Sequence, residues 1–148
     1  MGWVDMGRLV LAALSAALWL GQAVAAPRAE ARVLVEVDRA SQTMAVIVND
    51  EQLYTWRVST GRAGWVTPSG VFHPQFMAVH WYSRIFNNAP MPHSIFYSGP
   101  FAIHGTTDVA RLGRPASHGC IRLAPADAAV LFGIVEKEGR QNTTIVVQ

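Results

Sequence analysis

The chain has 148 residues, of which 51% are hydrophobic and 15% are charged, so it is long enough to form one packed domain and too apolar to be disordered. The formal net charge is only +2 and the basic residues are scattered along the chain, which argues against a nucleic-acid partner.

The first segment with a clear pattern is MGRLVLAALSAALWLGQAVAA, residues 6–26. One arginine precedes an apolar run that ends in small residues, which is typical of a secretory signal peptide with an Ala-x-Ala cleavage site. A membrane anchor is the alternative, but the apolar run over 9–20 is shorter than the roughly 20 residues that span a bilayer. We expect residues 1–26 to be a signal peptide, with translation starting at Met1 or Met6. The protein is then exported to the periplasm or cell envelope, without a stable membrane anchor.

The rest of the chain predicts mainly β-structure. Asn49-Asp50 is expected to form the turn of a hairpin, because it separates two segments of strand character. Glycine and proline interrupt residues 59–72, which predicts a loop that returns to a strand, and two prolines make 87–92 a loop. The expected strands cover residues 32–38, 42–48, 51–60, 76–86, 94–105 (as two short strands around Gly99-Pro100) and 143–148.

Helical character is confined to APADAAVLFGIVEKEG, residues 124–139. Pro125 suits the first helical turn, Asp127 favours the helix N-terminus, and Lys137 lies near the end before Gly139. We found no internal repeat and no low-complexity linker. The sequence therefore predicts a single-domain, mainly β fold with one principal helix near the C-terminus.

Cys120 is the only cysteine, and it lies in ASHGCIRLAP, residues 116–125. Cysteines of exported proteins normally form disulfides, and one thiol has no partner within its own chain. Cys120 is therefore a reactive group, a bridge to another molecule, or a buried inert side chain. A thiol attacks as the thiolate and needs a base or a positive environment, for which His118 and His104 are candidates. Gly119 permits a close backbone approach, and successive amides at this point would suit an oxyanion hole.

Histidine and cysteine are also zinc ligands, so a metal site formed by His104, His118 and Cys120 is an alternative. The sequence offers no paired cysteine, no carboxylate at ligand spacing and no evident fourth ligand. We expect neither a metal nor another cofactor.

The segment IHGTTDVARLGRPASHGCIRL, residues 103–123, resembles the signature of the YkuD-type L,D-transpeptidase catalytic domain. That signature is a histidine, a loop, and then [Ser/Thr]-His-Gly-Cys followed by an aliphatic residue and Arg or Asn. VSTGRAGWVTPSGVF (58–72) and NNAPMPHSIFYSGPFAIHG (87–105) are similar to further segments of the family, although His93 stands where the family often has an aromatic residue. The resemblance implies one catalytic domain over residues 32–148 with the L,D-transpeptidase fold.

The resemblance also implies a role for each matching residue. Cys120 would be the nucleophile and His104 its base, with the carbonyl group of Gly105 orienting the imidazole. A thiolate paired with an imidazolium is then expected to be reactive from roughly pH 6 upward. The other implied site residues are Ser117 and His118 at the pocket wall, the amides of Gly119 and Cys120 as oxyanion donors, and Arg122 and Met91 as substrate contacts. A structural salt bridge is the alternative role for Arg122.

The family acts on peptidoglycan stem peptides. The resemblance therefore implies acylation of Cys120 at the third-residue diamino acid with loss of the terminal D-alanine. The acyl group then passes to an amine, supplied by a second stem peptide or by a lipoprotein lysine. Two alternatives stay open. Water as the acceptor gives an L,D-carboxypeptidase, and a chain that keeps the fold without the chemistry is a silent cell-wall-binding module.

Overall fold

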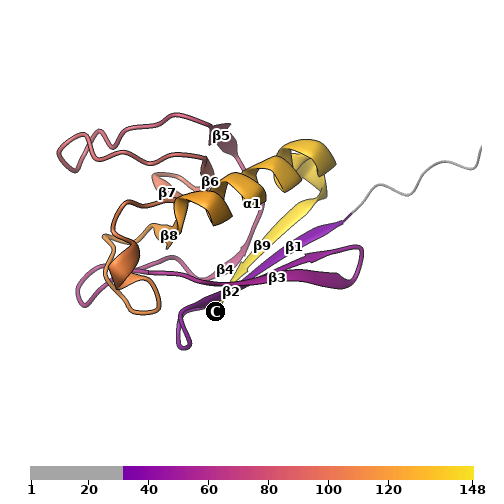
Figure 1. Ribbon diagram of the computed structural model, residues 1–148, viewed down its shortest axis with the longest axis horizontal. Helices are drawn as coiled ribbons and strands as arrows, with labels where there is room; N and C mark the ends of the chain where they lie inside the picture. The colour runs from indigo at the N-terminus through magenta and orange to yellow at the C-terminus, as the bar shows by residue number, and fades with distance from the viewer. Residues whose placement is uncertain (1–31) are drawn as a thin grey trace, which may run out of the picture.

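The computed structural model of the chain describes residues 32–148, so the predicted signal peptide lies outside the described residues. This part contains a five-stranded sheet with the order β3-β2-β1-β9-β4, called the first sheet, and a four-stranded sheet with the order β5-β6-β7-β8, called the second sheet (Figure 1). The strands are β1 (Val33–Asp38), β2 (Thr43–Val48), β3 (Glu51–Arg57), β4 (Gly70–Phe72), β5 (Phe76–Ala78), β6 (Ser94–Ser98), β7 (Phe101–Gly105), β8 (Ile121–Leu123) and β9 (Thr143–Val147). The helices are η1 (Val109–Arg111), α1 (Pro125–Glu138) and η2 (Arg140–Asn142).

This architecture confirms the predicted mainly β fold with one principal helix near the C-terminus. The β2–β3 hairpin turns at Asn49-Asp50 as expected, and these residues have φ values of 52° and 66°. Positive φ at both central residues is what a type I′ turn requires, and asparagine and aspartate tolerate it better than most residues. The helix begins at Pro125 and ends before Gly139, whose φ is 96°.

One predicted strand is wrong in its length. Of residues 76–86, only Phe76–Ala78 belong to a strand, which pairs with β6 up to the partners Ala78 and Ser94. Beyond that point the chain opposite contains Pro92 and Pro90, which have no amide hydrogen to donate to a ladder. Residues 79–93 therefore leave the sheet as a loop, closed by bonds such as that from the amide of Met91 to the carbonyl oxygen of Trp81, 2.8 Å long.

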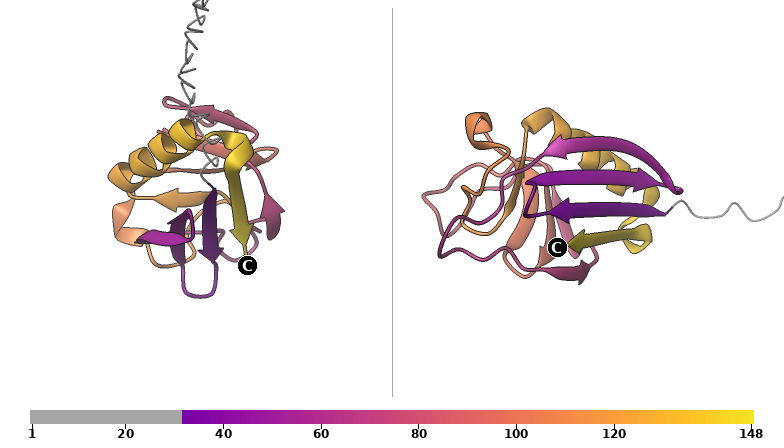
Figure 2. Two further views of the ribbon diagram at one scale, coloured as in Figure 1. Left: turned by 90° about the vertical axis from the view of Figure 1, so that its right-hand side faces the viewer. Right: turned by 90° about the horizontal axis from the view of Figure 1, so that it is seen from below.

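A single main core lies between the two sheets. Along β1, the alternate residues Val33, Val35 and Val37 are buried in it. Helix α1 contacts β7, β1 and β6, and buries its apolar side in the same core. Figure 2 (right) shows the first sheet from its outer side with α1 behind it. No helix within residues 32–148 has the length and the apolar character that crossing a bilayer requires.

The second sheet is buried on one face and carries a smaller apolar cluster on the other. Ile95, Ile103 and Ile121 are register neighbours that point into the main core. On the opposite face, Phe96 and Ala102 form a cluster with Met91, and Cys120 packs against that cluster. Because side chains alternate along a strand, every second residue of β7 and β8 must point to this second face.

Candidate active site

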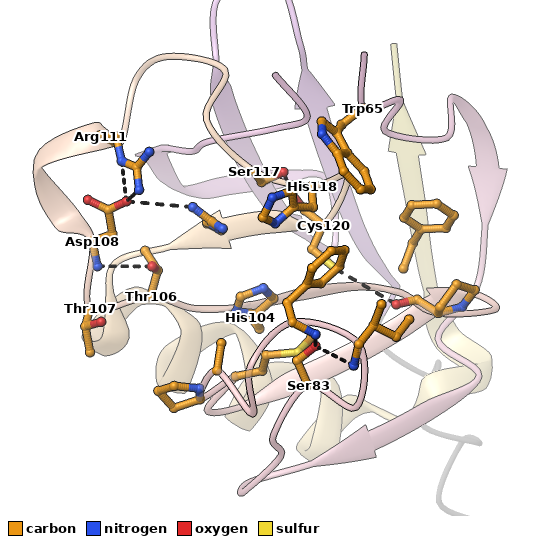
Figure 3. A pocket seen from close by; sticks show the side chains of 18 of the residues that line it. Trp65, Ser83, His104, Thr106, Thr107, Asp108, Arg111, Ser117, His118 and Cys120 are labelled. Atoms are coloured by element: carbon orange, nitrogen blue, oxygen red, sulfur yellow. Dashed lines mark hydrogen bonds and ion pairs between the residues drawn. The ribbon is translucent and has the colours of Figure 1, made fainter. Parts of the chain in front are cut away.

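The parallel pairing of β7 and β8 brings the predicted site residues onto one face of the second sheet. His104 of β7 is the register partner of Arg122 of β8. Cys120 lies two residues before Arg122, so its side chain leaves the chain on the same face. All three residues line one cavity of about 600 Å³. Figure 3 shows His104, His118 and Cys120 in the middle of this pocket, with Asp108 and Arg111 on one side and Trp65 on the other.

The imidazole of His104 is buried and held by the next residue along the chain. Its Nδ1 atom lies 2.7 Å from the carbonyl oxygen of Gly105. A carbonyl oxygen only accepts hydrogen bonds, so Nδ1 must carry the hydrogen and the neutral ring keeps Nε2 as an acceptor. Gly105 itself fits tightly, because a Cβ there would come within 3.1 Å of Pro92 and 3.2 Å of Pro125. The helix that begins at Pro125 therefore lies directly against the strand end that carries His104.

Burial determines the charge state of both reactive groups. It lowers the pKa of His104 to about 4, although the bond to Gly105 acts in the opposite direction. It also raises the pKa of the Cys120 thiol, although the amide of Ala102 and the charge of Arg122 oppose the shift. Both groups are therefore neutral at neutral pH, because desolvation disfavours each charged form. This corrects the expected thiolate–imidazolium pair that would be reactive from roughly pH 6.

The thiol itself donates to the carbonyl oxygen of Pro100, at a distance of 3.9 Å. Within residues 32–148, no hydrogen bond joins it to His104. Hydrogen bonds between catalytic groups are often long or unformed before substrate binds. The absence of this bond therefore does not argue against proton transfer from Cys120 to His104.

Hydrogen bonds within the loop fix the backbone around Cys120. The hydroxyl group of Ser117 donates to the carbonyl oxygen of Cys120 at 2.6 Å and accepts from the amide of Gly119 at 3.0 Å. The hydroxyl group of Thr67 donates to the carbonyl oxygen of Gly119 at 2.8 Å. Gly119 has a φ of 116°, and a Cβ there would lie 2.6 Å from the ring of Phe101, so only glycine fits. The amide of Gly119, expected to face an oxyanion, is thus engaged by Ser117 in this structure.

His118 lies between two aromatic rings of the pocket lining. It stacks on Phe86 with ring centroids 4.2 Å apart and an interplanar angle of 11°. It meets Trp65 edge-on, with the centroids 4.6 Å apart. Burial lowers the pKa of His118, and the nearby charges of Arg62 and Arg122 lower it further. Through these contacts, His118 connects the loop of residues 61–67, which contains Trp65, with the loop of residues 79–93, which contains Phe86.

The two tentative substrate contacts have different surroundings. Met91 is only 8% exposed and lines the cavity from the smaller apolar cluster. Nη1 of Arg122 lies 3.8 Å from Oδ2 of Asp108, so the structural salt bridge considered for this arginine is present. Asp108 also forms a salt bridge with Arg111. Among residues 32–148, no three His, Cys, Asp or Glu side chains are arranged to hold a metal ion.

The family model described as "L,D-transpeptidase catalytic domain" (YkuD) matches residues 32–147. The chain belongs to this family. An L,D-transpeptidase from Mycobacterium smegmatis superposes with a TM-score of 0.70 at 25% sequence identity, over 80% of this chain and 59% of that one. An L,D-transpeptidase from Stackebrandtia nassauensis gives a TM-score of 0.68 at 25% identity, over 79% of this chain and 55% of that one.

A third solved structure has the same fold at lower identity. L,D-transpeptidase 3 from Mycobacterium tuberculosis, in complex with a faropenem-derived adduct, gives a TM-score of 0.68 at 16% identity, over 80% of this chain and 60% of that one. This chain therefore spans less than two thirds of the length of these three solved proteins. None of the curated proteins compared with the chain matches it.

Several pocket residues of this YkuD domain were not identified from the sequence. Trp65, an aromatic residue that could either line a peptide groove or pack in the core, is 40% exposed and lines the cavity. Phe86, Asp108 and Arg111 carried no signal of their own, because each lies in a loop or short helix without periodicity. The position of Trp65 between Gly64 and Pro68 was the only hint that this side chain belongs to a surface loop.

Proposed function

We propose that this YkuD domain is a cysteine L,D-transpeptidase that acts on peptidoglycan stem peptides, with Cys120 as the nucleophile and His104 as its base. One observation carries the proposal. The only thiol of the chain shares a pocket and a sheet face with an imidazole whose Nδ1 is fixed by Gly105, which leaves Nε2 as a proton acceptor. A nucleophile, a base and a third group that orients the base are the parts that acyl transfer needs.

In the first half-reaction, the thiol of Cys120 loses its proton to Nε2 of His104 as the sulfur attacks the carbonyl carbon of the diamino acid. The C–N bond to the terminal D-alanine then breaks, and the imidazolium returns the proton to the departing amine. The products are a thioester on Cys120 and free D-alanine. A neutral thiol and a neutral imidazole suit this sequence, because the proton moves only when sulfur forms its new bond.

The developing oxyanion needs donors from the backbone around the nucleophile. We assign this role to the amide of Cys120. The amide of Gly119 becomes available only when its bond to Ser117 opens. The bond from Ser117 to the carbonyl group of Cys120 meanwhile holds that peptide in place.

In the second half-reaction, an amine attacks the thioester carbon and passes a proton to His104, and the sulfur of Cys120 leaves and is reprotonated. A stem peptide as the acceptor gives a cross-link, and a lipoprotein lysine gives an anchored protein. We further propose that the enzyme works in the periplasm or cell envelope. Two features support this location: the signal-like segment over residues 6–26, and the single cysteine, which has no second cysteine in the chain to form a disulfide with in an oxidising compartment.

Intact-protein mass spectrometry with faropenem tests the proposal, since a solved relative carries an adduct derived from this compound. The wild type should gain mass at Cys120 and the Cys120→Ala variant should not. A wild-type protein that stays unmodified and releases no D-alanine from a tetrapeptide would be a silent cell-wall-binding module. Product analysis with a tetrapeptide then identifies the acceptor, because a dimer indicates transpeptidation and a tripeptide alone indicates carboxypeptidase activity.

A further inference from the structure

One wall of the pocket brings two guanidinium groups to a single carboxylate. Arg111 comes from η1 and Arg122 from β8, and both contact Oδ2 of Asp108. Figure 3 shows Asp108 and Arg111 side by side on this wall, across the pocket from Trp65. All three charged residues line the cavity that contains Cys120. Two positive charges therefore share one negative charge within the site.

Arg122 also keeps hydrogen-bonding capacity that the protein does not use. Its Nη1 lies 3.8 Å from Asp108 and 3.5 Å from the carbonyl oxygen of Ala116, and both distances exceed those of good hydrogen bonds. A guanidinium group has five N–H donors. Burial and the neighbouring charge of Arg111 lower the pKa of Arg122, as expected for a cation whose charge is incompletely balanced. The side chains of Arg111 and Arg122 are 49% and 19% exposed, so a bound molecule has access to both.

We propose that Arg111 and Arg122 bind a free carboxylate on the side chain of the diamino acid at which the donor peptide is cleaved. This inference rests on the proposed function. The planar fork of a guanidinium group matches a carboxylate, and charge-assisted bonds of this kind are stronger than neutral ones. The preferred donor then carries a diamino dicarboxylic acid whose second carboxylate is not amidated. Asp108 holds the two guanidinium groups in place before the substrate arrives.

The spacing along the strand favours a side-chain carboxylate over the terminal carboxylate of the leaving D-alanine. Cys120 and Arg122 are two residues apart in extended backbone, which separates their Cα atoms by about 7 Å. The terminal carboxylate carbon lies about 3.5 Å from the attacked carbonyl carbon, the length of one residue. A carboxylate at the end of an aliphatic side chain reaches farther from that carbon, toward the wall that carries Arg122.

Turnover of three tetrapeptide donors tests the assignment. The donors differ only in the diamino acid, which has a free side-chain carboxylate, the same carboxylate amidated, or no carboxylate, as in lysine. We expect the wild type to favour the free acid in kcat/KM for D-alanine release by about tenfold or more, the effect of one charge-assisted contact. Arg111→Gln should reduce this preference by about tenfold. Arg114→Gln should keep it, because Arg114 lies in the same loop but does not line the cavity.

Two results overturn the inference. One is an equal kcat/KM for the three donors with the wild type. The other is a preference that disappears when only the C-terminal carboxylate of the donor is amidated, because the arginines would then bind the leaving residue. Faropenem acylation of each variant confirms an intact site in the same preparation. Turnover without preference contradicts this inference alone, whereas the absence of both turnover and acylation contradicts the proposed function.

Discussion

Arg122 lies opposite His104 in the parallel register of β7 and β8, with Cys120 two residues earlier on the same side. This one pairing places a buried base, a thiol and a cation on a single sheet face. The opposite face of the same strands is filled by Ile103 and Ile121 in the main core. A slip of one residue would exchange the two faces and bury the site, so the packing of the core also maintains the geometry of the site.

Replacing Cys120 with alanine should abolish adduct formation and D-alanine release while the fold persists. The thiol packs against the smaller apolar cluster, and the hydrogen bond that it donates to the carbonyl oxygen of Pro100 is long, at 3.9 Å, so we expect little stability to depend on it. Mass spectrometry and thermal melting on the same sample check both parts. Surviving activity with a large loss in melting temperature would instead identify Cys120 as an inert structural residue.

His104→Gln should lower kcat/KM by about 10²–10⁴-fold, the usual cost of removing a general base. The matched control is His73→Gln, since His73 also bonds a backbone carbonyl oxygen, that of Thr143 at 2.7 Å, but does not line the cavity. The control should retain wild-type activity. A comparable loss in His118→Gln with little loss in His104→Gln would assign the base to His118 instead.

The rate of alkylation of Cys120 by iodoacetamide should stay low at mildly acidic pH. Burial raises the pKa of this thiol, so the thiolate accumulates only above the ordinary range of a free cysteine. A rate profile from pH 5 to 10 measures this directly. A plateau that begins near pH 6 would show a preformed thiolate and would overturn the neutral pair described above.

Protonation of His104 should destabilise the folded protein. Its pKa is about 4 in the folded state against 6.5 in the unfolded chain, so the unfolded state binds the proton more tightly. The contribution of the neutral ring to the free energy of unfolding is therefore fully present above pH 6.5, and it is lost as the pH falls from 6.5 toward 4. The shift corresponds to about 3 kcal/mol of unfolding free energy. Urea unfolding at several pH values should show a shallower pH dependence in His104→Gln than in the wild type.

Gly119→Ala should destabilise the protein and remove activity, because a Cβ would lie 2.6 Å from the ring of Phe101 at a φ of 116°. Overpacking and backbone strain together should cost roughly 3 kcal/mol. Gly99→Ala is the control, since Gly99 also has a positive φ, of 53°, but no atom within 4 Å of an added Cβ. That change should cost only about 1 kcal/mol and leave acylation intact. Equal losses of unfolding free energy in the two variants would contradict the proposed clash between a Cβ at position 119 and Phe101.

The alternating valines of β1, the turn at Asn49-Asp50 and the helix that begins at Pro125 were predictable, because each depends on neighbours along the chain. The SHGC segment likewise singled out Cys120, and the histidine at the end of FAIHG singled out His104 as a candidate base. Strand β8 was missed, because Ile121–Leu123 is too short to show a period and exists only through its pairing with β7.

The charge state of the site depended on tertiary structure alone. The resemblance to the family suggests an ion pair between Cys120 and His104, whereas the folded protein places both groups where burial opposes their charged forms. Desolvation depends on every element that packs around a group, and here these elements include loops and strands far apart in the chain. The approach of Arg122 to Asp108 also depends on tertiary structure, since the pairing of β7 with β8 brings β8 beside the segment that follows β7 and leads into η1.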